Sequence, residues 1–378
     1  MPHYKFDQIA FNITDKKMPE PGDEKMYIGL EHLDSGSLKI TRWGSEVELT
    51  GQKLVMRKGD VLFGRRNTYL RRAAIAPHDG IFSAHGMIFR PKTQVIDPEY
   101  FPFFISSNYF MDAAIRISVG SLSPTVNWKT LKELEFDLPS LEEQRKNAAL
   151  LKSINETKEA YQELLIQTDN LVKSQFIEMF DTVTDAKPLA DLAEMVTVGI
   201  ANSATHAYVD DGVLMFRNQN IKANELDDSD LIYIKPEFAK KYESKTLKAN
   251  DILVARTGYP GTACIVPEKY AGSQTFTTLI VRMKQSSGLL PAFVCRYINS
   301  PSGQTYVKEN EAGSAQLNFG ATALSKMPII LPPMELQERY LVFAEQSDKS
   351  KFELKEAIKS CDALMKAILF TNLEEKEG

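Results

Sequence analysis

One long motif occurs twice in this sequence. The stretch LPSLEEQ recurs as LPPMELQ, and each copy is followed by about forty residues with helical periodicity. Pro139 and Pro332 lie 193 positions apart, and Gln144 and Gln337 keep the same offset. Solenoid repeats have units of roughly 20–50 residues, whereas this period is about half of the 378-residue chain. The chain is therefore predicted to be a duplicated half-molecule.

The duplication extends beyond the helical stretches. VMRKGDVLFGRR around Asp60 matches TLKANDILVART around Asp251 at an offset of 191, and VGSLSPTVNW matches AGSAQLNF at the same offset. Farther upstream, MYIGLEHLDSG resembles LMFRNQNIKAN. Each half is therefore expected to contain a β-rich segment, then a turn marked by proline, then a long helix.

Turn residues divide each β-rich segment into short strands. Gly, Pro and Asp cluster in MPEPGDE, DSGS and PHDG. The predicted strands are KMYIGL, SLKIT, DVLFGRR, AAIAP and HGMIFRP in the first half, and GVLMFR, DLIYIK, DILVART, ACIVP and FTTLIVRM in the second. One helix is expected over residues 98–117 and a matching one over 290–309. The predicted fold class is α+β, with a mainly antiparallel sheet or curled barrel in each half.

This order predicts four segments. They are a β-rich domain over residues 1–140, a central helix over 141–182, a second β-rich domain over 183–334 and a C-terminal helix over 335–378.

The two long helices are predicted to pair with each other. In the second, a stripe from Tyr340 to Ile368 alternates spacings of four and three, which is a heptad seam. The first presents a similar stripe that includes Leu164 and Leu171. Lys351 places a polar residue in the seam, and such residues often fix register. We expect an antiparallel coiled coil about a pseudo-twofold axis; the alternative is that each helix packs only on its own domain.

Charge is unevenly distributed along the chain. The net charge of −5 does not favour a protein with a generally basic surface for nonspecific nucleic-acid binding. Residues 53–92, however, contain nine Lys and Arg against two Asp, while acidic residues gather in ELDDSD and at the C-terminal end. A local basic segment on an acidic chain is typical of phosphate contact.

Neither a targeting segment nor a membrane span is predicted. The N-terminal MPHYKFDQIAFN lacks a signal-peptide pattern, and no run approaches 18 apolar residues, so we expect a cytoplasmic protein without membrane contact. The three widely spaced cysteines, Cys264, Cys295 and Cys361, predict buried thiols, not disulfides or a zinc site.

The sequence lacks the motifs of the common enzymes. It contains no phosphate-binding P-loop, no H-E-x-x-H and no G-x-S-x-G, and no Asn/Asp-Pro-Pro-aromatic motif of an amino-methyltransferase. IDPEY at Ile96 lacks the second acid and the lysine of a nuclease site, and Asp97 is interpreted as a helix N-cap. The histidines have no metal-ligand spacing. We therefore expect neither catalysis nor a metal site in this chain.

Two β-rich segments, each followed by the LP-x-x-E-x-Q-type motif and a long helix, resemble the specificity subunit of type I restriction-modification enzymes. The resemblance covers essentially the whole chain and includes FDLPSLEEQRK, IILPPMELQER and a Gly-Asp-hydrophobic-Leu signature at Gly59–Leu62. Asn250 replaces the glycine in the second copy, a departure compatible with the same turn.

The resemblance implies a division of labour among subunits. Each β-rich segment would be a target recognition domain that reads one half of a bipartite, asymmetric site in double-stranded DNA. The helices would act as a ruler and as the dock for two methyltransferase subunits, which restriction subunits would join. S-adenosylmethionine, ATP and magnesium would belong to those partners, so no cofactor is expected in this chain.

Candidate DNA contacts follow the same strand in each repeat. Arg reads guanine bidentately and Asn or Gln reads adenine, although any single Arg also suits a phosphate. Polar, Arg- and Tyr-bearing loops follow DVLFGRR and DILVART, RNQN lies upstream in the second repeat, and Lys245 and Lys92 suit positioning contacts. The candidates are Arg65, Arg66, Asn67, Thr68, Tyr69, Arg71, Arg72, His85, Lys92, Arg217, Asn218, Gln219, Asn220, Lys245, Arg256, Thr257 and Tyr259. The main alternative function is a coiled-coil scaffold whose domains bind other proteins; an intrinsic methyltransferase or nuclease is disfavoured.

Overall fold

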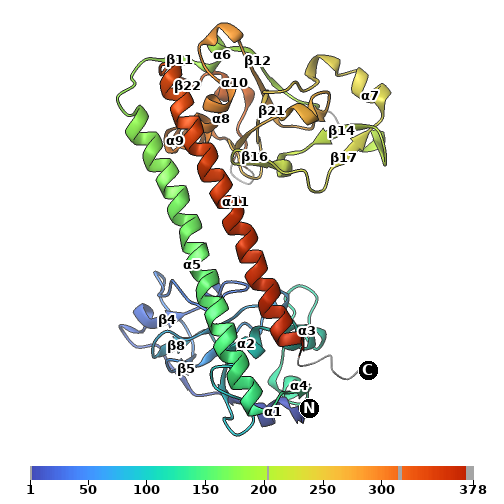
Figure 1. Ribbon diagram of the computed structural model, residues 1–378. Coiled ribbons are helices and arrows are strands. Elements are labelled where there is room, and N and C mark those ends of the chain that lie inside the picture. Colours follow the sequence, from blue (N-terminus) through green and yellow to red (C-terminus); the bar gives the residue numbers. More distant parts are fainter. Residues whose placement is uncertain (1, 202–203, 314–316, 372–378) are drawn as a thin grey trace. The chain divides into compact units, whose positions relative to one another are not determined.

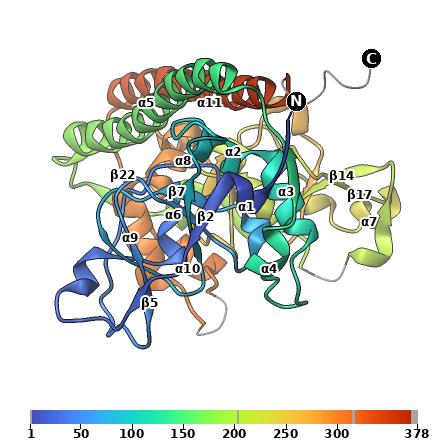
Figure 2. The ribbon, with the colours of Figure 1, turned by 90° about the horizontal axis from the view of Figure 1, so that it is seen from below.

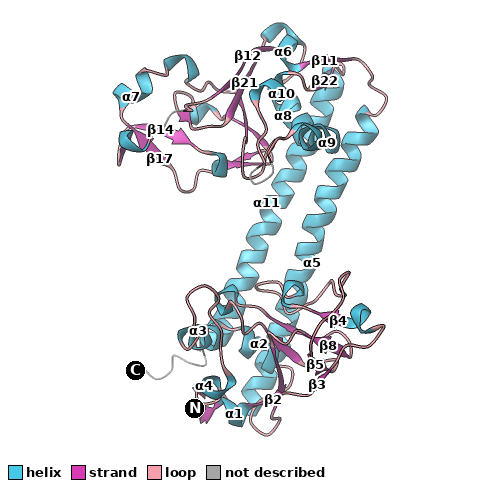
Figure 3. Cartoon of the chain, turned by 180° about the vertical axis from the view of Figure 1, so that it is seen from behind, coloured by secondary structure: helices cyan, strands magenta, loops and turns pink. Residues whose placement is uncertain are grey.

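The computed structural model describes residues 2–201, 204–313 and 317–371 (Figure 1). The chain divides into two compact units: unit 1 is Met1–Glu163 with Leu354–Gly378, and unit 2 is Leu164–Glu353. Each unit therefore includes part of both long helices, α5 (Leu141–Phe180) and α11 (Met334–Thr371). Helices and strands both build each unit (Figure 3), so the fold class is α+β, as predicted.

Two four-stranded sheets form the described β structure of unit 1, together with one separate pair of strands. The first sheet has the order β2-β9-β6-β7 and is antiparallel; the second has the order β3-β5-β8-β4, with β4 and β8 parallel. β1 pairs with β10. These strands are β1 (His3–Lys5), β2 (Ala10–Ile13), β3 (Lys16–Lys17), β4 (Tyr27–Ile28), β5 (Lys53–Met56), β6 (Val61–Phe63), β7 (Ala73–Ile75), β8 (Gly80–Phe82), β9 (Met87–Pro91) and β10 (Glu135–Asp137).

Unit 2 repeats this plan in the residues that the structure describes. Its first sheet, β12-β21-β18-β19, is antiparallel, and its second, β13-β17-β14-β20, again contains one parallel pair, β14 with β20. β11 pairs with β22, and β15 with β16. These strands are β11 (Ala186–Pro188), β12 (Ala193–Val198), β13 (Tyr208–Val209), β14 (Val213–Phe216), β15 (Ile221–Lys222), β16 (Glu225–Leu226), β17 (Ile232–Ile234), β18 (Ile252–Val254), β19 (Ala263–Ile265), β20 (Gln274–Thr275), β21 (Leu279–Met283) and β22 (Pro328–Ile330).

In each half, two consecutive helices stand where a single helix was expected. α2 (Phe101–Ser106) and α3 (Asn108–Arg116) are separated by Ser107, and α8 (Pro291–Asn299) and α9 (Pro301–Asn310) by Ser300. Both serines have extended backbones, and their hydroxyls accept a backbone N–H of the second helix at 3.2 Å. Serine caps helices in this way, so each ends one helix and starts the next.

Two other expectations need correction. SLKIT forms no strand: Leu38 and Ile40 are buried, but the segment has one backbone hydrogen bond to a strand, from Ile75 N to Leu38 O. Asp97 does accept the Glu99 and Tyr100 N–H groups, as an N-cap would, but the helix begins only at Phe101. The repeated segment AGSAQLNF lies partly outside the described residues, as does the acidic C-terminal tail.

Short helices cover the first sheet of each unit. α2 packs on β7 in unit 1 (Figure 2), and α8 packs on β18 and β19 in unit 2. The remaining short helices are α1 (Phe6–Ile9), α4 (Trp128–Leu131), α6 (Leu189–Leu192), α7 (Pro236–Lys240) and α10 (Ala321–Ser325).

The repeated glutamine anchors each long helix to its unit. Gln144 is fully buried; its Oε1 accepts the Asp97 N–H at 2.7 Å, and its Nε2 donates to the Val95 and Pro139 carbonyls. Gln337 repeats this arrangement, accepting from Leu290 N at 2.9 Å and donating to two carbonyls. A buried amide needs such partners, because unpaired polar groups are costly. The motif therefore has a structural role.

The repeated aspartate fixes the start of the strand that precedes each candidate loop. Asp60 binds Arg90 through two hydrogen bonds, and Asp251 binds Arg282 through two hydrogen bonds of 2.8 and 2.7 Å. Gly59 has φ +88° and Asn250 has φ +66°. Asn is among the few residues that tolerate this region, so the predicted compatibility of Asn250 with the glycine turn is confirmed.

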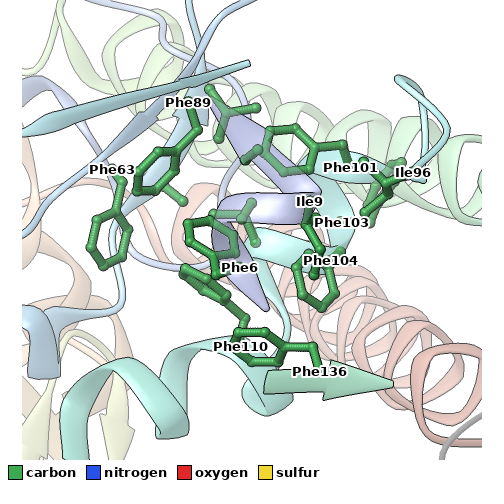
Figure 4. Packing of buried hydrophobic residues seen from close by; sticks show 14 of the residues in the cluster. Phe6, Ile9, Phe63, Phe89, Ile96, Phe101, Phe103, Phe104, Phe110 and Phe136 are labelled. Carbon is green, nitrogen blue, oxygen red and sulfur yellow. The ribbon is translucent and has the colours of Figure 1, made fainter. Parts of the chain in front are cut away.

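An aromatic core fills unit 1. Phe6, Phe89 and Phe110 lie at its centre, with the Phe6 ring centroid 5.2 Å from Phe89 and 5.0 Å from Phe110 (Figure 4). Leu151 of α5 and Leu369 of α11 belong to the same cluster, so the two helices pack together on this core.

Unit 2 also packs both helices on its core. Phe176 and Phe180 of α5 contact Tyr340 of α11, with ring centroids 5.2 and 5.4 Å apart. On α11 the predicted seam from Tyr340 to Ile368 is buried or half-buried at each of its positions. On α5, in contrast, Leu164 and Leu171 are exposed, so the stripe expected there is wrong at these residues.

Candidate nucleic-acid interface

In unit 1 the candidate loop joins β6 to β7 and is held by internal hydrogen bonds. It contains the 3-10 helix Thr68–Leu70, flanked by left-handed residues Asn67 (φ 54°) and Arg71 (φ 49°). The Thr68 hydroxyl donates to the Arg65 carbonyl at 2.8 Å, and Thr68 is buried. Thr68 therefore shapes the loop, and we remove it from the candidate contacts. Tyr69, by contrast, is exposed.

A neighbouring loop, residues 118–125, is part of the same surface and was missed by sequence reasoning. Arg66 Nε donates to Ser123 Oγ at 2.8 Å, and Ser123 Oγ donates to Asn67 Oδ1 at 2.9 Å. Leu122 at the tip of this loop is 97% exposed, and Val119 is exposed too. The loop belongs to the repeated segment VGSLSPTVNW, and an apolar residue among Gly, Ser and Pro was the available signal.

In unit 2 the candidate loop joins β18 to β19 and meets the RNQN turn. Arg256 N donates to Asn218 Oδ1 at 2.7 Å, and Arg256 Nε donates to Asn318 Oδ1 at 2.9 Å. Tyr259 at the tip is 79% exposed, and Thr257 is half-buried. The structure thus brings together two groups of candidates that are about forty positions apart in the sequence.

Asn220 builds the turn and is not available for contact. It is buried; its Oδ1 accepts the Arg217 N–H at 2.9 Å, and its Nδ2 donates to the Asp227 and Ser229 carbonyls. The equivalent turn of unit 1 uses His32, whose Nδ1 lies 2.9 Å from Gly29 N. We therefore remove Asn220 from the candidate contacts as well.

Several cationic candidates already have partners within the protein. Arg71 bonds to Asn108 and forms an ion pair with Asp112, and Arg72 donates to the Leu30 and Arg66 carbonyls. Burial lowers the pKa of Arg72 from its ordinary value. These arginines are held in place, which limits how far they can reach.

In unit 2, Arg217 and Gln219 both donate hydrogen bonds to Asp230 Oδ2, at 2.8 and 2.6 Å. Lys92 lies over the ring of Phe11, 4.7 Å from its centroid, and Lys245 donates to the Gly199 carbonyl at 2.9 Å. Both lysines are therefore occupied by internal contacts. His85 is exposed on the turn between β8 and β9, and no hydrogen bond or ion pair among the described residues joins it to the Arg65–Arg72 loop.

The cysteines have the predicted character. Cys264, Cys295 and Cys361 are free and buried, and burial raises the pKa of the Cys295 thiol to about 12. In the described ranges, no group of three or more His, Cys, Asp or Glu is placed to hold a metal ion. None of the described helices combines the length and apolar character that a membrane crossing needs.

Known proteins share this architecture. A family model described as the type I restriction modification DNA specificity domain matches twice, over residues 11–167 and 185–360. The type I restriction enzyme EcoDI specificity subunit from Escherichia coli is 23% identical over 199 residues, covering 51% of this chain and 44% of that protein. The match therefore spans less than half of the length of this relative.

Two solved structures have the same fold. One, from work on complex assembly and conformational transition of the type I R-M system, has 17% identity and a TM-score of 0.56, and covers 98% of this chain and 97% of that one. The other, a type I restriction-modification system S subunit from M. genitalium, has 12% identity and a TM-score of 0.54, and covers 97% and 95%. Because the family model matches most of its length in two copies, the chain belongs to the family of type I restriction-modification DNA specificity domains.

Proposed function

We propose that this chain is the non-catalytic DNA-recognition subunit of a type I restriction-modification complex. Each unit reads one half of a bipartite, asymmetric site in double-stranded DNA. One observation carries the proposal: a loop bearing Arg and Tyr follows the equivalent strand, β6 or β18, in both units, while the two loop sequences differ. Two similar surfaces with different side chains suit two half-sites with different sequences. The alternative of a protein-binding scaffold leaves these repeated loops without a role.

The proposed contact surface differs between the units. In unit 1 it consists of Arg65, Arg66 and Tyr69 with the loop 118–125, in which the exposed Leu122 suits an apolar contact with a thymine methyl or between base pairs. In unit 2 it consists of Arg256, Thr257 and Tyr259 with the Arg217–Gln219 turn. Arg71 and Arg72, which bond internally, serve as phosphate contacts or hold the loop.

The long helices set the gap between the half-sites and dock two methyltransferase subunits, which restriction subunits join. S-adenosylmethionine, ATP and magnesium are bound by those partners in this proposal. Leu171 on α5 and Leu364 on α11 support two docking sites. They occupy equivalent positions, 193 residues apart, and are 54% and 55% exposed. The same helices also expose Ile166 and Phe352, and larger exposed apolar surfaces are typical of partner contact.

The DNA-binding proposal predicts a steep dependence of affinity on salt. The chain, reconstituted with its methyltransferase subunit, is expected to bind duplex DNA with a log affinity that falls linearly with log salt, by about 0.9 per phosphate contact. Arg66→Ala should reduce the magnitude of this slope by about 0.9, the contribution of one phosphate contact. Fluorescence anisotropy at several salt concentrations measures it.

Lys349→Ala is the matched control, because Lys349 is an exposed cation on α11 that pairs only with Glu345 in the described part of the chain. Its slope should equal that of the unmodified protein. Binding that does not depend on salt, or no binding by the reconstituted complex, would refute the proposed function.

The docking proposal predicts a change in stoichiometry. Leu171→Glu or Leu364→Glu, each alone, should leave a complex with one methyltransferase subunit in place of two, because a charge at the centre of an apolar contact is desolvated without a partner. The double variant should bind none. Native mass spectrometry counts the subunits. Val47→Glu, at an exposed apolar residue that belongs to neither long helix, is the control and should retain two. A double variant that also retains two would refute this docking site.

A further inference from the structure

Each long helix carries one lysine and one aspartate eleven residues apart, Lys158 and Asp169 on α5 and Lys351 and Asp362 on α11. The two sets are 193 positions apart, the offset of the motif that precedes each helix. Within unit 1, Lys158 Nζ lies 2.7 Å from Asp362 Oδ1. Within unit 2, Lys351 Nζ lies 3.0 Å from Asp169 Oδ1. The same ion pair therefore occurs twice. In unit 1 α5 supplies the lysine and α11 the aspartate, and in unit 2 α11 supplies the lysine and α5 the aspartate.

Both lysines occupy positions where an unpaired charge would be unfavourable. Lys158 is only 8% exposed, and its Nζ also donates to the Gly36 carbonyl at 3.0 Å. Lys351 lies in the predicted heptad seam and is partly buried. Burial opposes its charge, but hydrogen bonds to Asp169 and Asp348 outweigh that effect and raise the pKa of Lys351. A buried lysine that lost its acceptor would destabilise the helix pair.

We propose that these two ion pairs determine the direction and register in which α5 and α11 pair within each unit. Eleven residues span about three helical turns, or roughly 16 Å, so the lysine and the aspartate of one helix lie on one face. Antiparallel pairing brings Lys to Asp at both places. Parallel alignment of the same stretches would bring Lys158 to Lys351 and Asp169 to Asp362, placing like charges together. A slipped register would leave each lysine among apolar side chains.

This pairing has a consequence for the recognised DNA, and that consequence rests on the proposed function. If the helices set the gap between the half-sites, the four charged residues are positioning residues for that gap. They contact no DNA in the proposal, so they act only through the helix pair. The pairing itself is testable without DNA.

The test is a charge swap in the full chain. Lys351→Asp places a third carboxylate beside Asp169 and Asp348, and Asp169→Lys leaves two ammonium groups facing each other. Each should lower Tm by about 3–6 °C. The double variant K351D/D169K restores an ion pair and should recover most of the loss. Spin labels at Lys173→Cys on α5 and Val342→Cys on α11, both exposed positions of unit 2, report the separation of the helices.

Each single reversal should shift or broaden the label-to-label distance, and the swap should restore it. Swapping the exposed pair Glu345 and Lys349 on α11, 3.2 Å apart, is the matched control and should change neither readout. Single reversals that leave the distance unchanged, or a swap that does not recover it, would overturn the proposal. If the distances between the spin labels behave as expected while no variant binds DNA, the proposed function fails and the pairing proposal stands. If all variants bind DNA, methylation mapping should give the same gap length for the double variant and the unmodified protein.

Discussion

Replacing Asp251 with Ala is expected to lower the free energy of unfolding by about 3–5 kcal/mol, the usual cost of removing one partner of a buried ion pair. The Asp251 side chain is 1% exposed and Arg282 is 13% exposed, and two hydrogen bonds join them. Without the carboxylate, the guanidinium stays buried without its counterion, and the Lys248 N–H loses its acceptor. Urea unfolding followed by circular dichroism measures the change.

Two comparisons sharpen this expectation. Asp60→Ala in unit 1 should cost less, because its partner Arg90 is more exposed to water than Arg282. Asp228→Ala should change stability little, because the ion pair of Asp228 with Lys269 is exposed on both sides. A small effect for Asp251→Ala, equal to that for Asp228→Ala, would contradict the structural role assigned to the repeated aspartate.

The sequence predicted the plan of the fold because duplication is visible without any knowledge of contacts. Matching LPSLEEQ with LPPMELQ located both long helices, and the paired Asp60 and Asp251 segments located equivalent strands. What these residues do was not predictable in the same way. Gln144 and Gln337 look like surface residues of a polar motif, but they are fully buried and hold the helix starts to the units.

Local patterns failed where a single residue changes the backbone direction. Ser107 and Ser300 lie within stretches of continuous helical periodicity, and periodicity alone does not reveal that a serine caps a new helix there. In SLKIT, alternating apolar residues predicted a strand, but alternation reports only which side chains are buried. Leu38 and Ile40 are buried, and the Leu38 carbonyl accepts one backbone hydrogen bond from Ile75 of β7, but the segment forms no strand.

The candidate surface was predicted by residue type and refined by burial. Arg, Asn and Tyr near the ends of equivalent strands marked the two loops as candidates, since these side chains suit DNA. Type alone did not separate Tyr259, which is exposed, from Asn220, which builds its own turn. Leu122 was not among the predicted candidates because its proposed role depends on the loop 118–125 lying beside Arg66, a contact between segments more than fifty positions apart.

Two sets of substitutions in the proposed DNA-binding surface should each weaken recognition of a different half-site. Arg65→Ala, Tyr69→Ala or Leu122→Ser in unit 1 should relax discrimination at one half-site, and Arg256→Ala or Tyr259→Ala in unit 2 at the other. A lost bidentate base contact costs about 1–3 kcal/mol, or roughly 10- to 200-fold in discrimination. Residues that contact only phosphate would instead weaken binding to all sequences equally.

Competition binding by the reconstituted complex measures this effect, with duplexes in which one half-site at a time is substituted. Each variant is expected to tolerate substitutions in its own half-site while rejecting them in the other as strongly as the unmodified protein. Tyr259→Phe is the conservative control, because it keeps the exposed ring of Tyr259 and removes only the hydroxyl. If every variant relaxed both half-sites to the same extent, recognition would not be divided between the units, and the sequence difference between the two repeated loops would need another explanation.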